Sequence, residues 1–114
     1  MKQSISFFEN YKFYKTRINA KRMELDMVDN NDTEIATQIM DDIADCQRKM
    51  NEIEHAVATH TDHAERGNAR QRRELREEQL FLESRYIAGM TMEKTAEAMH
   101  VSRDTAYRIR RRLV

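Results

Sequence analysis

The sequence predicts an all-α protein, built as a long antiparallel helical hairpin followed by a helix-turn-helix domain. Three observations support this fold class. Among the 114 residues there is no proline and there are two glycines, so helix breakers are scarce, and 35% of the residues are charged, as in long solvated helices. Two extended apolar stripes repeat in steps of three and four residues. Two short helical patterns separated by turn signals then close the sequence.

The first helix is expected over residues 4–28, with Ser4 placed to cap it. The polar run 29–32 predicts a turn. Aromatic residues at helical spacing are more often core than partner surface. Phe8 and Phe13 lie off the apolar seam, and they would mark a dimer or partner contact if they were exposed. The seam itself follows Phe7, Tyr11, Tyr14, Ile18, Lys21, Leu25 and Val28.

The second helix is expected to begin at Asp32 or Thr33 and to continue to about Thr61. Two such stripes joined by a short polar turn indicate an antiparallel hairpin. A two-helix hairpin buries little by itself, so we expect a second copy or the C-terminal domain to cover its open face. Its seam follows Ile35, Ile39, Ile43, Cys46, Met50, Ile53, Val57, His60 and Ala64.

The periodicity weakens near Gly67, which places a domain boundary between residues 1–66, the hairpin, and residues 67–114. In the second domain we expect helices over 69–88, 92–99 and 103–113. Gly89 should end the first of these helices, Thr91 and Ser102 should cap the other two, and His100 and Val101 should form the turn between them. One face of the last helix, Ala106, Ile109 and Leu113, is expected to pack on Thr95, Ala96, Met99 and Tyr86.

Charge is distributed unevenly along a chain whose net charge is zero. Residues 1–64 hold 8 Lys/Arg against 12 Asp/Glu, whereas residues 65–114 hold 12 Lys/Arg, 11 of them Arg, against 8 Asp/Glu. The last twelve residues contain five Arg and one acidic residue, although a merely solvated helix usually mixes signs. Because Arg forms bidentate contacts with phosphate and guanine, this end is the candidate for binding a polyanion.

The last helix is therefore expected to enter the major groove of double-stranded DNA. Residues near its start should meet base edges, namely Arg103, Asp104, Tyr107 and Arg108. Phosphate contacts are expected from the backbone at Ser102 and from Arg110, Arg111 and Arg112. A second basic patch, Arg66, Arg70, Arg72, Arg73 and Arg76, offers Arg72 and Arg73 as further phosphate contacts. Alternatively, that patch is a salt-bridged surface in which Arg73 pairs with Glu77.

The segment 86–109 resembles the DNA-binding domain of bacterial sigma factors that reads the upstream promoter element. The shared pattern is Arg-Tyr, a short turn with Gly, a helix with Ala near its middle, an apolar-Ser pair and a final helix, and it departs at Asp104 and Tyr107. The chain also resembles phage regulators of the ArpU and RinA type, in which a helical segment, often opening with a Tyr-rich stretch like residues 8–14, precedes a sigma-like domain. This resemblance implies control of late phage transcription. We also expect the hairpin to dimerise the protein or to dock it on another protein such as RNA polymerase, in the cytoplasm of a bacterial host.

Other classes of function find less support. No phosphate-cradling glycine loop, nucleophile elbow or cleft-forming carboxylate pair is present, so we expect no catalytic residue and no cofactor. His55, His60, His63 and Cys46 do not have an established metal-ligand spacing, so we expect no metal. A single cysteine is typical of a reducing compartment, and no apolar run reaches the length of a membrane span.

The sequence therefore predicts a sequence-specific DNA-binding transcriptional regulator that forms a homodimer, and two alternatives remain open. A phage small terminase subunit also joins a helix-turn-helix to oligomerising helices, and it would bind packaging-site DNA as a ring. A protein-binding helical module, such as an inhibitor, would keep its activity when the arginines of the last helix are replaced.

Overall fold

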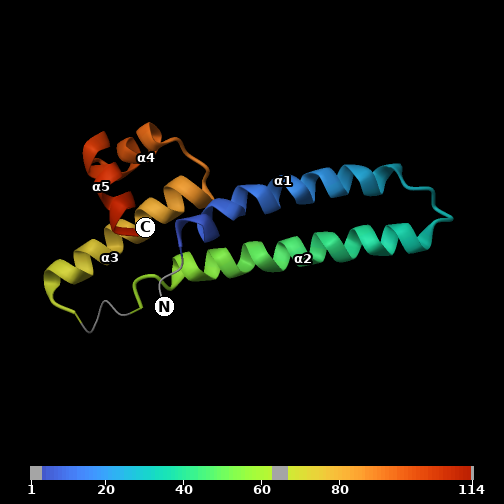
Figure 1. Cartoon of the computed structure of the whole chain (residues 1–114), viewed down its shortest axis with the longest axis horizontal. Coiled ribbons are helices and arrows are strands. Elements are labelled where there is room, and N and C mark those ends of the chain that lie inside the picture. The colour runs from blue at the N-terminus through green and yellow to red at the C-terminus, as the bar shows by residue number, and fades with distance from the viewer. Residues whose placement is uncertain (1–3, 63–66, 114) are drawn as a thin grey trace.

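The computed structural model describes residues 4–62 and 67–113, and within these ranges every regular element is a helix. The two long helices α1 (Ile5–Met27) and α2 (Thr33–Ala58) lie antiparallel as a hairpin (Figure 1). At one end of the hairpin a compact unit follows. This unit, called the C-terminal unit below, consists of α3 (Ala69–Leu82), a π-helical turn η2 (Glu83–Ile87), α4 (Met92–Met99) and α5 (Arg103–Leu113). The predicted all-α class, with its hairpin, is confirmed.

Short polar side chains define where several helices begin. Asp32, Asn68 and Thr91 each accept a hydrogen bond from the backbone N–H three residues later, at 3.3, 2.9 and 3.2 Å. Ser4 occupies the position before α1 but makes no capping bond, because its hydroxyl bonds to that of Ser6 instead. The expected cap at Ser4 is therefore wrong.

The second helix ends earlier than expected, at Ala58 and not at Thr61. Both the N–H and the hydroxyl of Thr59 donate to the carbonyl of His55, each at 2.9 Å. A threonine hydroxyl that bonds back to the preceding turn competes with the regular helical pattern, and here it closes the last turn.

The two apolar seams meet along the hairpin. Ile18 of α1 and Cys46, Met50 and Ile53 of α2 are buried. The one lysine in the first seam, Lys21, is half-buried and lies 3.6 Å from Asp42 of α2, which explains how a charge is accommodated there. Ile35, expected in the second seam, is instead 46% exposed, since it lies next to the turn where the hairpin opens into solvent.

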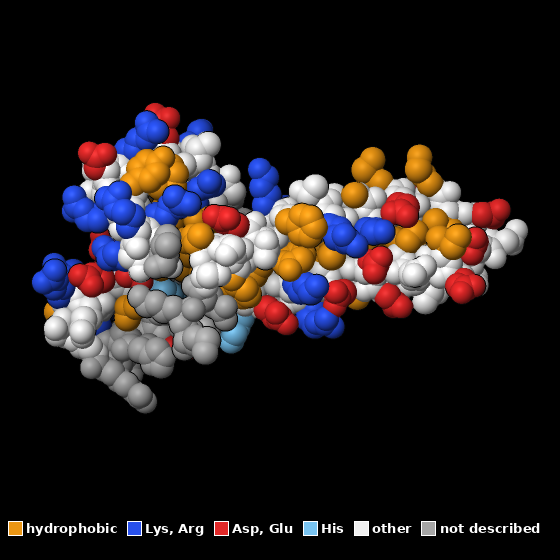
Figure 2. All heavy atoms as spheres, in the orientation of Figure 1, with side chains coloured by type: hydrophobic (Ala, Val, Ile, Leu, Met, Phe, Trp, Pro, Cys, Tyr) orange, Lys and Arg blue, Asp and Glu red, His pale blue; other side chains and the backbone are white. Residues whose placement is uncertain are grey.

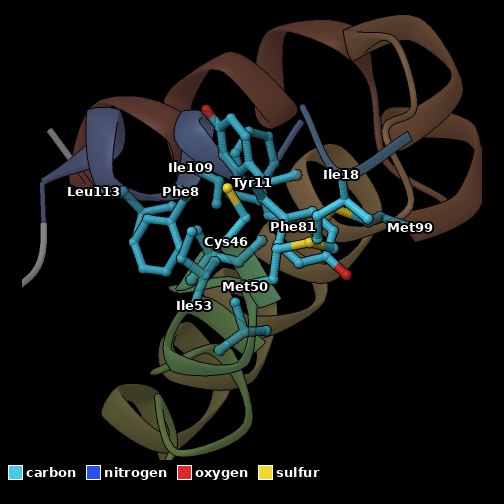
Figure 3. Packing of buried hydrophobic residues seen from close by; sticks show 13 residues of the cluster. Phe8, Tyr11, Ile18, Cys46, Met50, Ile53, Phe81, Met99, Ile109 and Leu113 are labelled. Atoms are coloured by element: carbon cyan, nitrogen blue, oxygen red, sulfur yellow. The ribbon is translucent and has the colours of Figure 1, made fainter. Parts of the chain in front are cut away.

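The base of the hairpin and the C-terminal unit share one hydrophobic core (Figure 3). Phe8 of α1 lies where the hairpin meets the C-terminal unit. It is 4% exposed and stacks on Tyr86 of η2, with ring centroids 6.2 Å apart. Tyr86 in turn meets Phe81 edge to face, with centroids 6.0 Å apart. Phe8 was expected to mark a dimer or partner contact if it were exposed, and it is buried instead, because α1 packs on η2 as well as on α2. The C-terminal unit thus covers one end of the hairpin.

The boundary predicted near Gly67 consequently separates elements along the chain but not hydrophobic cores. Residues 63–66, which include the predicted positions His63, Ala64 and Arg66, lie outside the described residues.

None of the described helices combines the length and the apolar character that crossing a bilayer requires.

Candidate nucleic-acid interface

Helix α5 is fixed by one apolar face. Ala106 and Ile109 are fully buried and Leu113 is 6% exposed. The predicted partners of this face are buried too: Thr95, Ala96 and Met99 of α4, and Tyr86 of η2. Small side chains, Ala96 and Ala106, let α4 and α5 approach closely, so the opposite face of α5 is held toward solvent.

A tight turn sets the angle between α4 and α5. His100 adopts left-handed backbone geometry, with φ 57°, and the N–H of Val101 bonds to the carbonyl of Ala96 at 3.0 Å. The hydroxyl of Ser102 then accepts a bond from the N–H of Thr105 at 3.1 Å, which confirms the predicted cap.

The loop before α4 is fixed in a similar way. Gly89 has φ +72°, the left-handed conformation that was expected to end the preceding helix. The guanidinium of Arg85 donates to the carbonyl of Met90 at 2.8 Å and closes the loop. The preceding helix is not regular to its end, because residues 83–87 form a wider π-helical turn that the sequence pattern did not indicate.

The outward face of α5 carries the base-contact candidates. Arg103, Asp104 and Arg108 are exposed, while Tyr107 is half-buried. The guanidinium of Arg103 lies over the Tyr107 ring, 5.8 Å from its centroid. Hydrogen bonding with Tyr107 is the largest effect that raises the pKa of Arg103 above its ordinary value. Like any arginine, this side chain is charged at any accessible pH. Figure 2 shows many Lys and Arg side chains over the C-terminal unit, interspersed with Asp and Glu side chains, and the hairpin also carries both signs.

The phosphate-contact candidates on α5 divide into two groups. Arg111 is exposed, and its side chain, like that of Arg108, makes no hydrogen bond or ion pair with any residue of 4–62 or 67–113. Arg110 is half-buried and lies 3.9 Å from Glu9 of α1, a distance at the outer limit of an ion pair. Arg108, Arg110 and Arg111 can therefore bind an external anion, because little or no ion-pair energy within the protein is lost when they do so.

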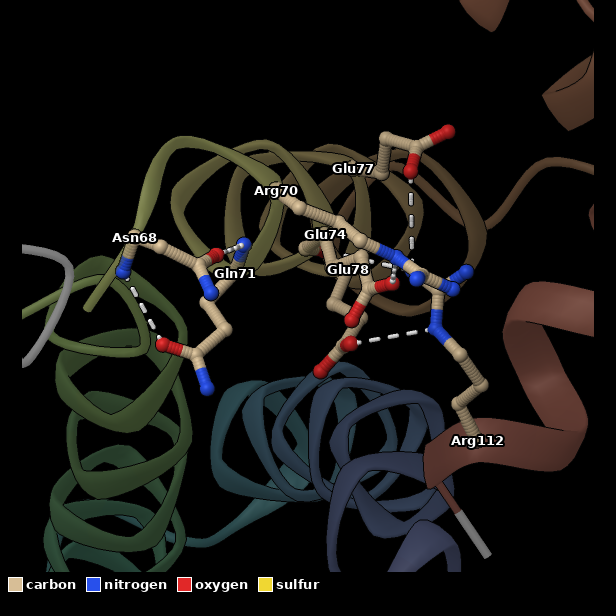
Figure 4. A network of polar contacts seen from close by, with 7 residues as sticks. All are labelled: Asn68, Arg70, Gln71, Glu74, Glu77, Glu78 and Arg112. Carbon is tan, nitrogen blue, oxygen red and sulfur yellow. Dashed lines mark hydrogen bonds and ion pairs between the residues drawn. The ribbon is translucent and has the colours of Figure 1, made fainter.

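Arg112 belongs to the protein's own structure. It reaches from α5 to α3, where its Nε lies 3.2 Å from the carboxylate of Glu78 and its Nη2 lies 3.7 Å from that of Glu77 (Figure 4). Its Nη2 also donates to the backbone carbonyl of Glu74 at 3.2 Å. A guanidinium held by two carboxylates is a poor phosphate ligand, so we reassign Arg112 from DNA contact to anchoring α5.

In the second basic patch, some arginines bond within the protein and others are exposed. Arg72 is half-buried and donates to the carbonyl of Gly67 at 2.8 Å, so its predicted phosphate role is weakened. Arg73 is exposed, and among the described residues it does not form the expected pair with Glu77. The pair that does form on this surface joins Arg70 to Glu74 at 3.3 Å. Arg73 therefore remains a candidate beside α5.

Glu78 is the one site residue that sequence reasoning missed. It is 5% exposed, and its carboxylate joins Arg112 to His60, whose Nε2 lies 2.9 Å away. The position of His60 in the predicted seam of the second helix was a signal that its side chain turns inward, but nothing local to Glu78 distinguished it from the neighbouring acidic residues.

His55 is exposed, and within residues 4–62 and 67–113 no group of three His, Cys, Asp or Glu side chains could hold a metal ion.

The chain matches no protein-family model, no curated protein and no solved structure.

Proposed function

We propose that this protein is a sequence-specific DNA-binding transcriptional regulator, and that α5 is its reading helix. The observation that carries the proposal is the construction of α5: one side is clamped in the core, and the other presents Arg103, Arg108 and Arg111 to solvent. A protruding helix with these side chains fits the major groove, where a guanidinium matches the two acceptors of guanine.

The roles differ along the helix. Arg103, Asp104, Tyr107 and Arg108 lie in its first half, and they are the proposed base contacts. Arg110 and Arg111, with the backbone N–H groups that follow Ser102, are the proposed phosphate contacts. Arg73 of α3 would extend the phosphate surface. Control of phage late genes is proposed from the resemblance to ArpU- and RinA-type regulators, and contact with RNA polymerase is proposed for the hairpin.

Selection of bound DNA from a random pool, followed by titration of the selected duplex, tests this function. We expect a consensus sequence and an affinity that falls steeply with salt. Arg108→Ala should cost about 1–3 kcal/mol on the selected site and relax its preference at one position. Arg111→Ala should weaken binding to all sequences alike and lower the log–log salt slope by about one unit.

Arg22→Ala is the matched control, because Arg22 is exposed on the hairpin and its loss changes the net charge equally. It should leave both affinity and salt slope unchanged. If no consensus is recovered, and Arg108→Ala behaves like Arg22→Ala, the function lies elsewhere. Recovery of one packaging-type site by a ring of many subunits would instead favour the small terminase alternative.

A further inference from the structure

Helix α1 carries a second stripe that faces away from α2. Its members follow steps of three and four residues and none is charged: Phe13, Thr16, Ala20, Met23 and Met27. All five are exposed, and the three large ones reach 58% for Phe13, 69% for Met23 and 87% for Met27. Figure 2 shows hydrophobic side chains standing at the α1 edge of the hairpin. An apolar seam at this spacing is the pattern by which one helix packs on another.

The charges that border this stripe are sorted along the helix. Lys12 and Arg17 flank its first half, whereas Glu24 and Asp26 flank its second half. In helix pairs, such flanking residues meet across the seam and decide the orientation. A parallel pair of identical helices would bring Lys12 against Arg17 and would be repelled. An antiparallel pair brings the basic half of one helix beside the acidic half of the other.

We propose that α1 pairs through this stripe with α1 of a second copy of this chain, antiparallel and centred near Ala20. Lys12 of each copy then faces Asp26 of the other, and Arg17 faces Glu24. Ala20 allows the two backbones to approach at the symmetry axis. Phe13 lies against the methionines of the other copy, a favourable sulfur–aromatic contact. Such a contact is self-complementary, as a two-fold dimer requires. The interface does not depend on DNA binding.

This arrangement leaves the reading surface free. Phe8, where the C-terminal unit joins α1, lies about 18 Å from Ala20 at the α-helical rise of 1.5 Å per residue. The two C-terminal units therefore lie at opposite ends of a four-helix rod, and their junctions with α1 are about 36 Å apart. The proposed interface residues of α1 do not include Arg103, Arg108 or Arg111 of α5.

Sedimentation equilibrium of the full chain without DNA tests the proposal. The wild-type protein should have twice the 13.6 kDa chain mass. Lys12→Glu and Met23→Glu should each shift the equilibrium to monomer, and the double variant Lys12→Glu/Asp26→Lys should restore the dimer. Arg22→Glu is the matched control, since Arg22 is equally exposed but lies off the stripe, and it should remain dimeric. Unchanged circular dichroism would show that each variant is folded.

Orientation is tested by mixing a Lys12→Cys variant with an Asp26→Cys variant and adding a short bismaleimide. Antiparallel pairing predicts a cross-linked product that contains one chain of each variant. A wild-type monomer at high micromolar concentration would overturn the proposal, and so would a dimer that withstands both Lys12→Glu and Met23→Glu. Cross-linking of Lys12→Cys chains only to one another would overturn the antiparallel orientation. Since DNA is absent throughout, none of these outcomes depends on the proposed regulatory function.

Discussion

The carboxylate of Glu78 offers the sharpest test of how α5 is held. Glu78→Gln keeps the shape of the side chain but removes the charge that joins Arg112, at 3.2 Å, to His60, at 2.9 Å. Removing one partner of a fully buried pair costs about 3–5 kcal/mol. Here Arg112 is 30% exposed and keeps its contact with Glu77, so we expect a loss of about 2 kcal/mol.

The assay is urea denaturation followed by circular dichroism, with the midpoint expected to fall at unchanged m-value. In thermal unfolding the same loss should lower the midpoint by about 8 °C. Glu97→Gln is the matched control, because Glu97 is exposed and its side chain forms no hydrogen bond or ion pair with the described residues; it should stay within about 0.5 kcal/mol of wild type. Combining Glu78→Gln with Arg112→Ala should cost less than the sum of the two single changes. Equal stability of Glu78→Gln and Glu97→Gln would refute the anchoring role of Arg112.

Three further predictions concern single positions. His100→Gly should raise stability by about 0.5–1 kcal/mol, because His100 holds φ 57° at the turn before α5; a loss measured by urea denaturation would mean that the imidazole makes a compensating contact. Thr95→Val should stabilise by about 1 kcal/mol, since the buried Thr95 hydroxyl has no hydrogen-bond partner among the described residues; a lower thermal midpoint would contradict this. Burial, together with a 2.6 Å hydrogen bond to Glu54, raises the pKa of Tyr11 from 10.0 to about 12. Because the folded state favours the neutral phenol, this contribution to stability is complete below pH 10.0 and is lost as pH rises toward 12, so Tyr11→Phe should flatten the dependence of the urea midpoint on pH in that range.

Local patterns predicted the helices well. The caps at Thr91 and Ser102, and the left-handed Gly89, follow from bonds within a few residues, so the sequence alone carries the relevant information. The buried face of α5 was predictable for a similar reason, because apolar periodicity reports which side of a helix faces a core. Apolar periodicity does not indicate which other elements of the protein cover that face.

The contacts between distant segments were not predictable in that way. Phe8 was expected off the seam, because a single helical stripe cannot indicate that α1 packs on a second partner, Tyr86. Arg112 was expected at phosphate because its neighbours in sequence are cationic. Its actual partners, Glu77 and Glu78, lie on α3, and only the packing of α5 on α3 brings them together. The wider π-helical turn of η2 likewise has no local signal that we can identify.

The aromatic junction between the hairpin and the C-terminal unit has a consequence for synthesis of the protein. Phe8 leaves the ribosome long before Tyr86, a delay of about 4–16 s at 5–20 residues per second. Throughout that interval the nascent hairpin displays an uncovered aromatic ring, which is a natural target for a chaperone. A chain interrupted before η2 would keep that ring bare permanently and would be prone to aggregate.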